Sequence, residues 1–212
     1  MGILRQGVNG SMTNKTGAII GRVHRGQNVI VGLYRSGKRK RIMTENQTSA
    51  AYRFGLLSSF LSGITSFVKI GFKKMVKHNS PVNAALSYNY DHAFIVEDGV
   101  VRLNYPKLVY SIGDVEPPES PDIECTDGLM KLSWFDMPQS RFCQYTDTAS
   151  VIVYEPLIDE RMAFRNVCPR SDLSVLLDVT PLIGSTVHCY VSFTSADGKL
   201  QGKNVYLGML DV

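Results

Sequence analysis

The stretch Val187-His188-Cys189-Tyr190-Val191-Ser192-Phe193 decides the fold of the carboxy-terminal half of this chain. Apolar and polar side chains alternate over most of its length, a pattern typical of a strand with one face in a core and the other in solvent. The turn signal Asp197-Gly198 follows it, and residues 203–210 form another β-type run. We therefore predict two strands here, over residues 186–194 and 203–210.

Working outward from this stretch, five further β-type runs precede it, and turn signals such as Asp127-Gly128 and Asp136-Met137-Pro138 separate them. The predicted strands are residues 122–125, 129–135, 149–155, 162–165 and 173–179. Short strands at this spacing are typical of an all-β sandwich. Residues 116–121 are rich in proline and predict a linker. The sequence thus predicts a β-sandwich domain over residues 117–212.

Residues 1–43 are rich in glycine and in basic side chains. Two short apolar runs, residues 17–21 and 28–34, lie on either side of a connection that contains Gly26. Two β-branched runs joined in this way predict a hairpin. Because a two-stranded hairpin is only marginally stable alone, it needs a partner surface from this chain or from another. We predict a basic arm with a hairpin over residues 1–43.

The segment 44–116 begins with a helix signal, in which Thr44 and Gln47 form a capping box. After it, apolar residues recur at alternating steps of four and three, which predicts one long amphipathic helix. These residues are Ala50, Phe54, Leu57, Leu61, Ile64 and Val68. Gly63 lies inside this pattern, where it costs about 1 kcal/mol relative to alanine and indicates close packing.

Beyond this helix, Ser80-Pro81 predicts a second, short helix that runs to about Tyr88. Residues 100–104 and 107–111 are β-type runs. The sequence therefore predicts a chain that is mainly β with one long helix: an arm over 1–43, a helix with a short helix and strands over 44–116, and a β-sandwich over 117–212.

The charge of the chain is divided between its two ends. Residues 1–80 carry 14 Lys and Arg and one acidic residue, a net charge of +13. Residues 81–212 carry 9 Lys and Arg and 18 acidic residues, a net charge of −9. Such a division suits a chain that grips a polyanion with one end, or one whose basic arm docks on the acidic body of a neighbouring copy.

The cysteines and histidines indicate neither a metal site nor a catalytic site. None of Cys125, Cys143, Cys168 and Cys189 belongs to a CxxC pair or has a histidine at metal-binding spacing. The four histidines are scattered along the chain. We expect reduced thiols in a β-rich core, with a Cys143–Cys168 bridge as the alternative. We assign no catalytic residue, no metal and no cofactor, and we expect no small-molecule substrate.

A basic cluster in the arm is the candidate for contact with nucleic acid, because phosphates need fixed cations and arginine presents a fork that fits them. The residues are Arg22, Arg25, Arg35, Lys38, Arg39, Lys40 and Arg41. The alternatives are a solvated basic loop and a loop that pairs with acidic groups of another subunit. Short basic runs have low specificity, so all three interpretations stay open.

The apolar stripe of the long helix is the candidate for an oligomer interface. Its residues are Phe54, Leu57, Leu61, Ile64 and Val68. Residues 1–80 offer little else that could bury this stripe, so it packs either on the β part of the chain or on copies of itself. A face on a membrane surface is a third interpretation, although no run in the sequence approaches the length of a membrane span.

The stretch from about residue 118 to residue 212 resembles a fibronectin type III or immunoglobulin-like domain. The residues that carry the resemblance are Leu132-Ser133-Trp134, residues 149–154, and Cys189-Tyr190-Val191-Ser192-Phe193, followed by Asp197-Gly198 and a last strand. The resemblance implies a β-sandwich. It implies no single function, because such domains serve as spacers, binders and coat decorations.

The whole chain resembles an uncharacterised family of proteins from Bacteroidota. The matching segments are residues 1–7, 69–73 and 80–89, together with Tyr190-Val191-Ser192-Phe193, Ala196-Asp197-Gly198 and residues 205–208. The family has no assigned activity, so the resemblance implies no functional residues.

We expect a non-enzymatic structural protein that forms a homo-oligomeric assembly and contacts nucleic acid or a neighbouring copy through its basic arm. A coat or virion protein of a small phage is the most concrete form of this expectation. The start of the sequence has no secretory signal, so we expect synthesis in the cytoplasm. The alternative is a cell-surface or secreted binding module, exported by an unrecognised route and carrying the Cys143–Cys168 bridge.

Overall fold

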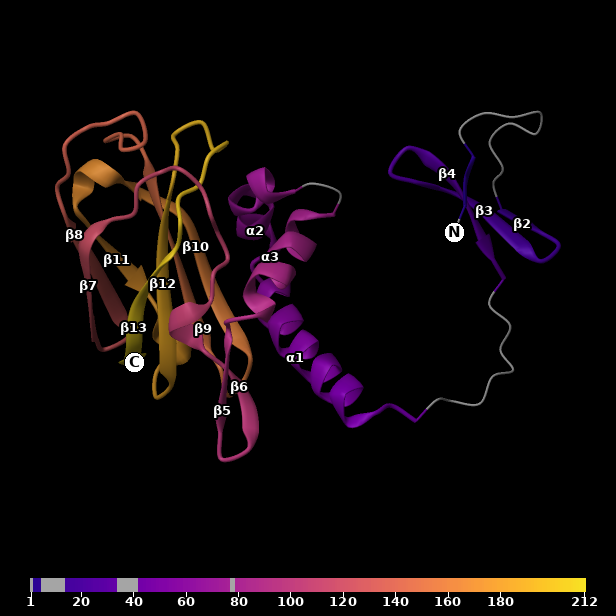
Figure 1. Ribbon diagram of the computed structural model, residues 1–212. Coiled ribbons are helices and arrows are strands. Elements are labelled where there is room, and N and C mark those ends of the chain that lie inside the picture. Colours follow the sequence, from indigo (N-terminus) through magenta and orange to yellow (C-terminus); the bar gives the residue numbers. More distant parts are fainter. Residues whose placement is uncertain (1, 5–13, 34–41, 77–78) are drawn as a thin grey trace. The chain divides into compact units, whose positions relative to one another are not determined.

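The computed structural model describes residues 2–4, 14–33, 42–76 and 79–212 (Figure 1). Contacts between residues divide the chain into two compact units, residues 1–44 and residues 45–212. We call residues 1–44 the arm and residues 45–212 the body.

The arm is a four-stranded antiparallel sheet. Its strands are β1 (Gly2–Leu4), β2 (Asn14–Thr16), β3 (Ile19–His24) and β4 (Gln27–Gly32), in the order β1-β4-β3-β2. The predicted hairpin is confirmed as β3 and β4. Arg25 and Gly26 join them, both with positive φ, as the tightest hairpin turns require.

The body begins with three α-helices, where we predicted one long helix followed by one short helix. They are α1 (Glu45–Ser62), α2 (Thr65–Gly71) and α3 (Pro81–Tyr90), with a short 3₁₀ turn, η1 (Lys73–Met75), before α3. The predicted start of α3 is confirmed, because Ser80 Oγ accepts a hydrogen bond from the Asn83 amide and Pro81 is the first helical residue.

The break between α1 and α2 falls at Gly63 and has a tertiary cause. The side chain of Arg161, which comes from the sheet, lies against Gly63 where a Cβ atom would stand. Arg161 Nη1 donates a hydrogen bond of 2.7 Å to the Ser59 carbonyl in the last turn of α1. A cation at this end of a helix stabilises carbonyl groups that have no partner within the helix.

A small hairpin of β5 (Phe94–Glu97) and β6 (Val100–Leu103) follows α3, and a 3₁₀ turn, η2 (Tyr105–Lys107), follows the hairpin. The predicted strand over residues 107–111 does not form. Instead, two buried asparagines take the place of neighbouring strands. Asn89 exchanges two hydrogen bonds with the Val109 backbone, and Asn204 binds the backbone of residues 108, 110 and 111.

The seven strands predicted after residue 116 are all present and form two antiparallel sheets that pack face to face. They are β7 (Glu119–Thr126), β8 (Leu129–Phe135), β9 (Thr148–Glu155), β10 (Glu160–Pro169), β11 (Ser174–Asp178), β12 (Thr186–Thr194) and β13 (Val205–Asp211). One sheet has the order β10-β9-β12-β13 and the other has the order β11-β8-β7. The 3₁₀ turns η3 (Arg170–Asp172) and η4 (Thr180–Leu182) flank β11.

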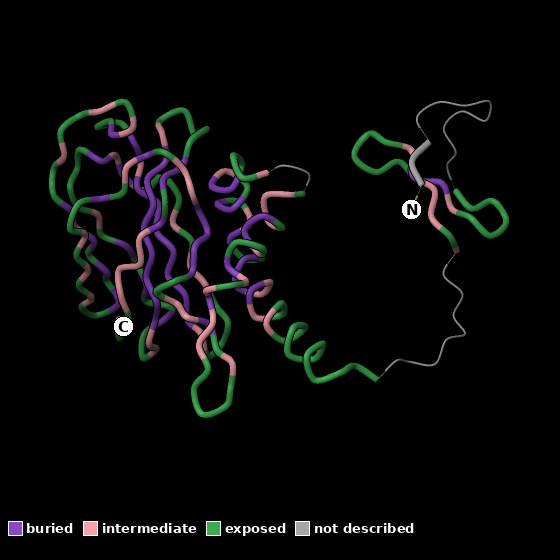
Figure 2. The backbone as a smooth tube through the Cα atoms, viewed as in Figure 1, coloured by how far each residue is buried: buried purple, intermediate pink, exposed green. Residues whose placement is uncertain are grey.

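The body has three layers, and this corrects the prediction that β12 is half exposed. In β9 and β12 every residue after the first is buried (Figure 2). Their inner face, which includes Val151 and Val191, packs on the three-stranded sheet. Their outer face, which includes Ile152, Tyr154 and Tyr190, packs under the helices. The polar residues of β12 are therefore buried as well.

The predicted domain boundary between residues 116 and 117 does not separate the helices from the sandwich, because both belong to the one body unit. The helices cover a face of the sheet and share one hydrophobic cluster with it. The division observed after residue 44 lies next to the boundary that we predicted after residue 43.

We predict that Gly63→Ala destabilises the body by about 1 kcal/mol, although alanine normally stabilises a helical segment by a similar amount. The new Cβ displaces Arg161, which then loses its bond to the Ser59 carbonyl. Urea denaturation measures the change. Gly55→Ala is the matched control in α1, since no atom lies within 4 Å of a Cβ at Gly55. The cost should disappear in an Arg161→Ala background, and a cost that persists there would show that Arg161 is not its cause.

Candidate functional site

The described strands of the arm form one sheet. The cross-strand pairs place Lys15 beside Ile20 and Val31, and Arg22 beside Val29, so one face combines cations with apolar side chains. Of the arm side chains that the structure describes, Val29 alone is buried among the apolar ones. On the other face Val23 is 58% exposed. Ile19 on that face is exposed as well, whereas Ile20 and Val31 on the first face are half-buried.

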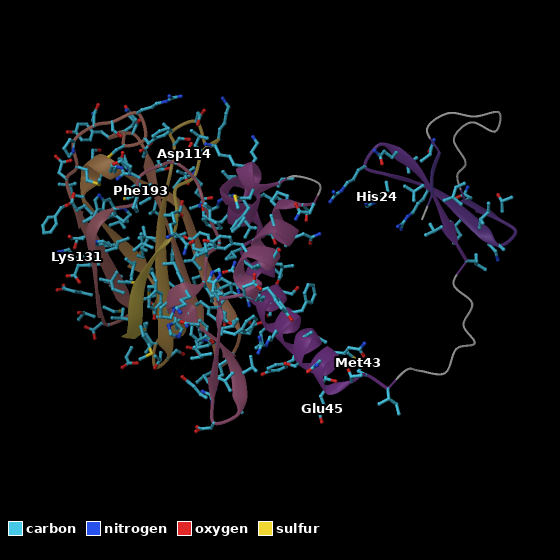
Figure 3. The ribbon with its side chains drawn as sticks, in the orientation of Figure 1. His24, Met43, Glu45, Asp114, Lys131 and Phe193 are labelled. Atoms are coloured by element: carbon cyan, nitrogen blue, oxygen red, sulfur yellow. The ribbon has the colours of Figure 1, made fainter. Side chains whose placement is uncertain are left out.

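The structure describes only part of the predicted nucleic-acid site. Arg22 on β3 and Arg25 in the β3–β4 turn are exposed, and both are close in sequence to His24, which is labelled in Figure 3. The other five predicted residues, Arg35, Lys38, Arg39, Lys40 and Arg41, lie outside the described residues. The sequence of residues 1–44 contains nine Lys and Arg and no acidic residue, whereas residues 45–212 contain 14 Lys and Arg and 19 acidic residues.

The apolar stripe of the helix is core, which corrects our assignment of it to an oligomer interface. Leu57, Leu61, Ile64 and Val68 are fully buried within the body. The partner that our sequence argument lacked is the outer face of β9 and β12, which supplies Ile152, Tyr154 and Tyr190. Phe54 differs from these four residues, because its side chain is 53% exposed.

An open apolar groove lies where the first half of α1 extends past the sheet. Its volume is about 990 Å³. Its walls come from α1, from the β5–β6 hairpin and from the segment that links β9 to β10. The apolar lining consists of Ala51, Tyr52, Gly55, Leu56, Ile95, Val101, Leu103, Pro106, Pro156 and Leu157. No side chain of α1 before Leu57 is buried, so this half of the helix is free to form a wall.

Aromatic rings close the base of the groove. The Tyr105 ring stacks on the His188 ring, with centroids 3.9 Å apart and planes inclined by 19°. His188 Nδ1 lies 2.8 Å from the Tyr206 hydroxyl, and the Tyr190 hydroxyl donates to the Tyr105 carbonyl at 2.9 Å. Burial lowers the pKa of His188 below its ordinary value, so the imidazole is neutral at pH 7.

Asp159 connects the groove to the end of α1. Its carboxylate accepts hydrogen bonds from Ser59 Oγ, from the Tyr154 hydroxyl at 2.9 Å, and from Arg161. Burial alone would raise the pKa of Asp159, but the hydrogen bonds from Ser59 and Tyr154 and the charge of Arg161 together lower it. The charge of Asp159 is therefore already neutralised within the body.

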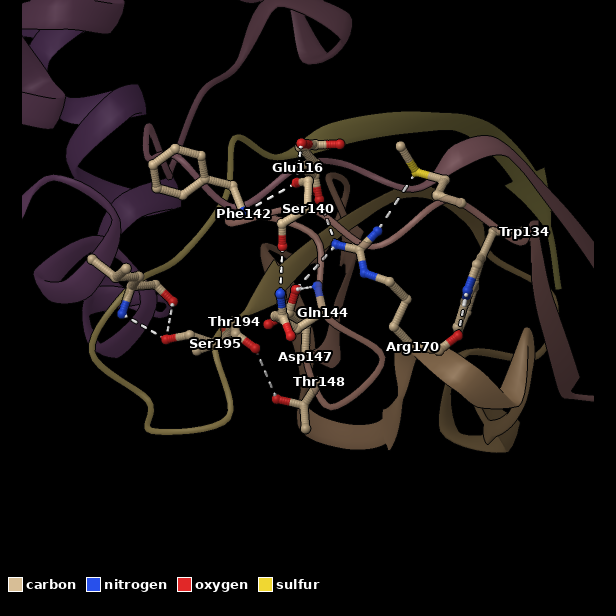
Figure 4. A network of polar contacts seen from close by, with 12 residues as sticks. Glu116, Trp134, Ser140, Phe142, Gln144, Asp147, Thr148, Arg170, Thr194 and Ser195 are labelled. Atoms are coloured by element: carbon tan, nitrogen blue, oxygen red, sulfur yellow. Dashed lines mark hydrogen bonds and ion pairs between the residues drawn. The ribbon is translucent and has the colours of Figure 1, made fainter.

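A second polar network lies inside the body, around Arg170 (Figure 4). Arg170 is 2% exposed, and its guanidinium lies 3.8 Å from the centroid of the Phe193 ring. Its Nη2 atom donates to the Glu116 carbonyl at 2.6 Å and lies 3.7 Å from an oxygen of Asp147. The Trp134 indole donates to the Arg170 carbonyl at 3.0 Å. The network fastens the predicted linker to the sandwich, which explains why no division falls there.

Burial in this network shifts the pKa values of Asp147 and Arg170, but the contacts of the network are structural. Burial raises the pKa of Asp147 and lowers the pKa of Arg170, because both charges are removed from solvent. Asp147 accepts from the Gln144 amide and Arg170 donates to the Glu116 carbonyl, so both side chains bind backbone groups, and neither lines the groove described above. Our sequence reasoning did not find the network, because no local pattern marks a buried arginine.

All four cysteines are free thiols, so the alternative Cys143–Cys168 bridge does not form. Burial raises the pKa of Cys143, raises that of Cys168 to about 11 and raises that of Cys189 to about 12. Because the thiolate is the reactive form, these three thiols are poor nucleophiles at neutral pH.

Among the described residues, no group of three or more His, Cys, Asp or Glu side chains is placed to hold a metal ion. No single helix in this part of the chain has the length and hydropathy of a membrane span, although α1 and α2 together have them as a pair bent by 91°.

We predict that His188 makes the body less stable as the pH falls from 7 toward 5. The unfolded state takes up a proton near pH 6.5, whereas the folded state resists it because burial lowers the pKa of His188. Urea midpoints at pH 7.5, 6.5 and 5.5 should fall less steeply in His188→Gln than in the parent chain. His24→Gln, on the exposed arm, is the control, and equal slopes in all three proteins would contradict the prediction.

Comparison with known proteins gives a family but no activity. No curated protein matches the chain. The model of a family of unknown function, DUF6266, matches residues 9–208, which is nearly the whole chain. The resemblance to an uncharacterised family is thus confirmed, while its attribution to Bacteroidota stays a prediction. The chain belongs to the DUF6266 family of unknown function.

Proposed function

We propose that this protein is a non-enzymatic structural protein that forms a homo-oligomeric assembly through its arm. The observation that carries the proposal is the arm itself. Its described strands form one sheet with the apolar side chains of Ile19 and Val23 exposed on one face, its sequence has no acidic residue, and it is a compact unit of its own.

The packing of the arm supports association. A β-sheet gains its stability by burying at least one face against another layer. Ile20, Val29 and Val31 lie on one face of the arm sheet, and Ile19, Val23 and Ile30 lie on the other. No second layer belongs to the described part of the arm. Another molecule that covers one of these faces would contribute the missing layer.

The charges support the same proposal and narrow the choice of partner. The arm has a net charge of +9, so two arms repel each other, whereas the body has a net charge of −5. A neighbouring body therefore attracts the arm more than a neighbouring arm does. Nucleic acid, which is negatively charged, would also attract the arm. If the arm binds nucleic acid, the protein we propose is a coat or virion protein.

We also propose that the sandwich is of the fibronectin type III kind. The order of its strands supports this, since three strands, β11-β8-β7, face four strands, β10-β9-β12-β13. The buried Trp134 on β8 meets Phe193 on β12 edge to face across the two sheets, with centroids 5.3 Å apart. Such a sandwich serves an assembly as a rigid body, but the fold itself carries no function.

We predict that the full chain forms oligomers at low salt that dissociate as the salt concentration rises toward 1 M, because screening weakens the attraction of the arm. Size-exclusion chromatography with light scattering gives the mass. Residues 45–212 should be monomeric, and they fold alone because both hydrophobic clusters lie within them. A full chain that is monomeric at tens of micromolar would overturn the proposed function.

Two double charge reversals test whether association depends on the cations of the arm or only on the net charge of the protein. Lys15→Glu with Arg22→Glu changes two cations on one face of the arm. Lys131→Glu with Lys199→Glu makes the same change in net charge on exposed positions of the body (Figure 3 labels Lys131). We expect the arm pair to reduce the oligomer mass and the body pair to leave it unchanged. Nuclease treatment that dissolves the oligomer would identify nucleic acid as the partner of the arm.

A further inference from the structure

We propose that the groove between α1 and the β5–β6 hairpin binds a long-chain aliphatic carboxylate. The chain would lie along the apolar wall of α1, and the carboxylate would lie at the mouth beside Arg102. This proposal concerns the body alone and does not depend on the assembly proposed above.

The size and the lining of the groove support a chain-like apolar ligand. The volume of about 990 Å³ is at the upper end of the range of small-molecule sites. Leu56, Ile95, Val101, Leu103 and Leu157 give it aliphatic walls from three separate elements. Leu157 is 90% exposed, so the lining holds a large apolar side chain in contact with water.

The aromatic base of the groove favours an apolar ligand. Tyr105 and His188 stack there, and the hydroxyls of Tyr190 and Tyr206 are engaged with the Tyr105 carbonyl and with His188 Nδ1. Tyr154 donates its hydroxyl to Asp159. These three hydroxyls are therefore engaged within the body, and the stacked rings of Tyr105 and His188 contribute aromatic surface to the lining.

The charges at the mouth favour a carboxylate. Among the described residues that line the groove, Arg102 is the one with a permanent positive charge. Its side chain is 64% exposed, and its ion pair with Glu97 has a long separation of 3.8 Å. The second acidic residue in the lining, Asp159, is neutralised by Arg161. A ligand carboxylate can thus approach Arg102 and make the bidentate contact that Glu97 does not make.

Gly55 allows the groove to be closed without damage to the fold. It lines the groove from α1, and a Cβ at this position meets no atom within 4 Å. Gly55→Ala should stabilise the helix and leave the groove open. Gly55→Trp places an indole in the space that the ligand chain would occupy. The two variants form a matched pair.

The first experiment is a fluorescence titration of the full chain with cis-parinaric acid, a polyene fatty acid, followed by displacement with palmitate. We expect saturable binding of one molecule per chain, retained in Gly55→Ala and weakened at least tenfold in Gly55→Trp. Absence of saturable binding, or equal binding by the two variants, would overturn the proposal. Circular dichroism and urea denaturation show that both variants are folded.

The second experiment tests the position of the carboxylate. Arg102→Gln should weaken the displacement by palmitate several-fold and leave the displacement by hexadecanol, the alcohol of the same chain length, unchanged. An equal effect on both compounds would overturn the assignment of the carboxylate to Arg102.

Light scattering on the same variants distinguishes a ligand from a protein partner. A groove that binds a fatty acid predicts the same oligomer mass for Gly55→Ala and Gly55→Trp. A lower mass for Gly55→Trp alone would make the groove an interface between copies and would overturn the proposal, while leaving the proposed assembly intact. The salt-dependent mass of the parent chain and of residues 45–212 decides the proposed function independently.

Discussion

The body depends on covering the outer face of the four-stranded sheet. Ile152, Tyr154 and Tyr190 make this face large and apolar, and each such side chain contributes about 1.5–3 kcal/mol when it is buried. Phe60 of α1 meets the Tyr154 ring at 5.2 Å and the Tyr190 ring at 6.0 Å. The helices are therefore a structural layer of the sandwich and not a domain beside it. The tie between Arg161 and the Ser59 carbonyl fixes where α1 ends on this face.

The groove follows from the same constraint, because α1 is longer than the face that it covers. The second half of the helix carries its buried residues, and the first half runs beyond the sheet (Figures 1 and 2). The β5–β6 hairpin approaches this free half without filling the space between them. The groove is the space left between α1 and the β5–β6 hairpin where the two elements diverge. Its lining is apolar because both elements continue to carry apolar side chains beyond the core.

The sequence allowed the strands to be predicted, because their signals are local: β-branched runs, and turns such as Asp127-Gly128 and Asp197-Gly198. It did not allow their environment to be predicted. His188 and Ser192 indicate a solvent face by their polarity, yet both are buried, with partners in Tyr206 and Tyr110. The break at Gly63 depends on Arg161, and the course of residues 108–111 depends on Asn89 and Asn204. The groove joins three distant segments, so no window of sequence contains its pattern.

Because the apolar stripe of α1 and α2 is buried inside the body from Leu57 onward, it does not supply an interface for assembly. If Leu57, Leu61 and Ile64 lay on a surface, the helix itself would demand a partner, but they are satisfied inside the body. In our proposal the need for a partner moves to the arm, whose described strands form one sheet and whose sequence contains no acidic residue. Apolar exposure sets how strongly such a sheet associates, while its charge sets what it associates with. A partner that meets both demands must present apolar surface and negative charge together, which an acidic folded body does and a second arm does not.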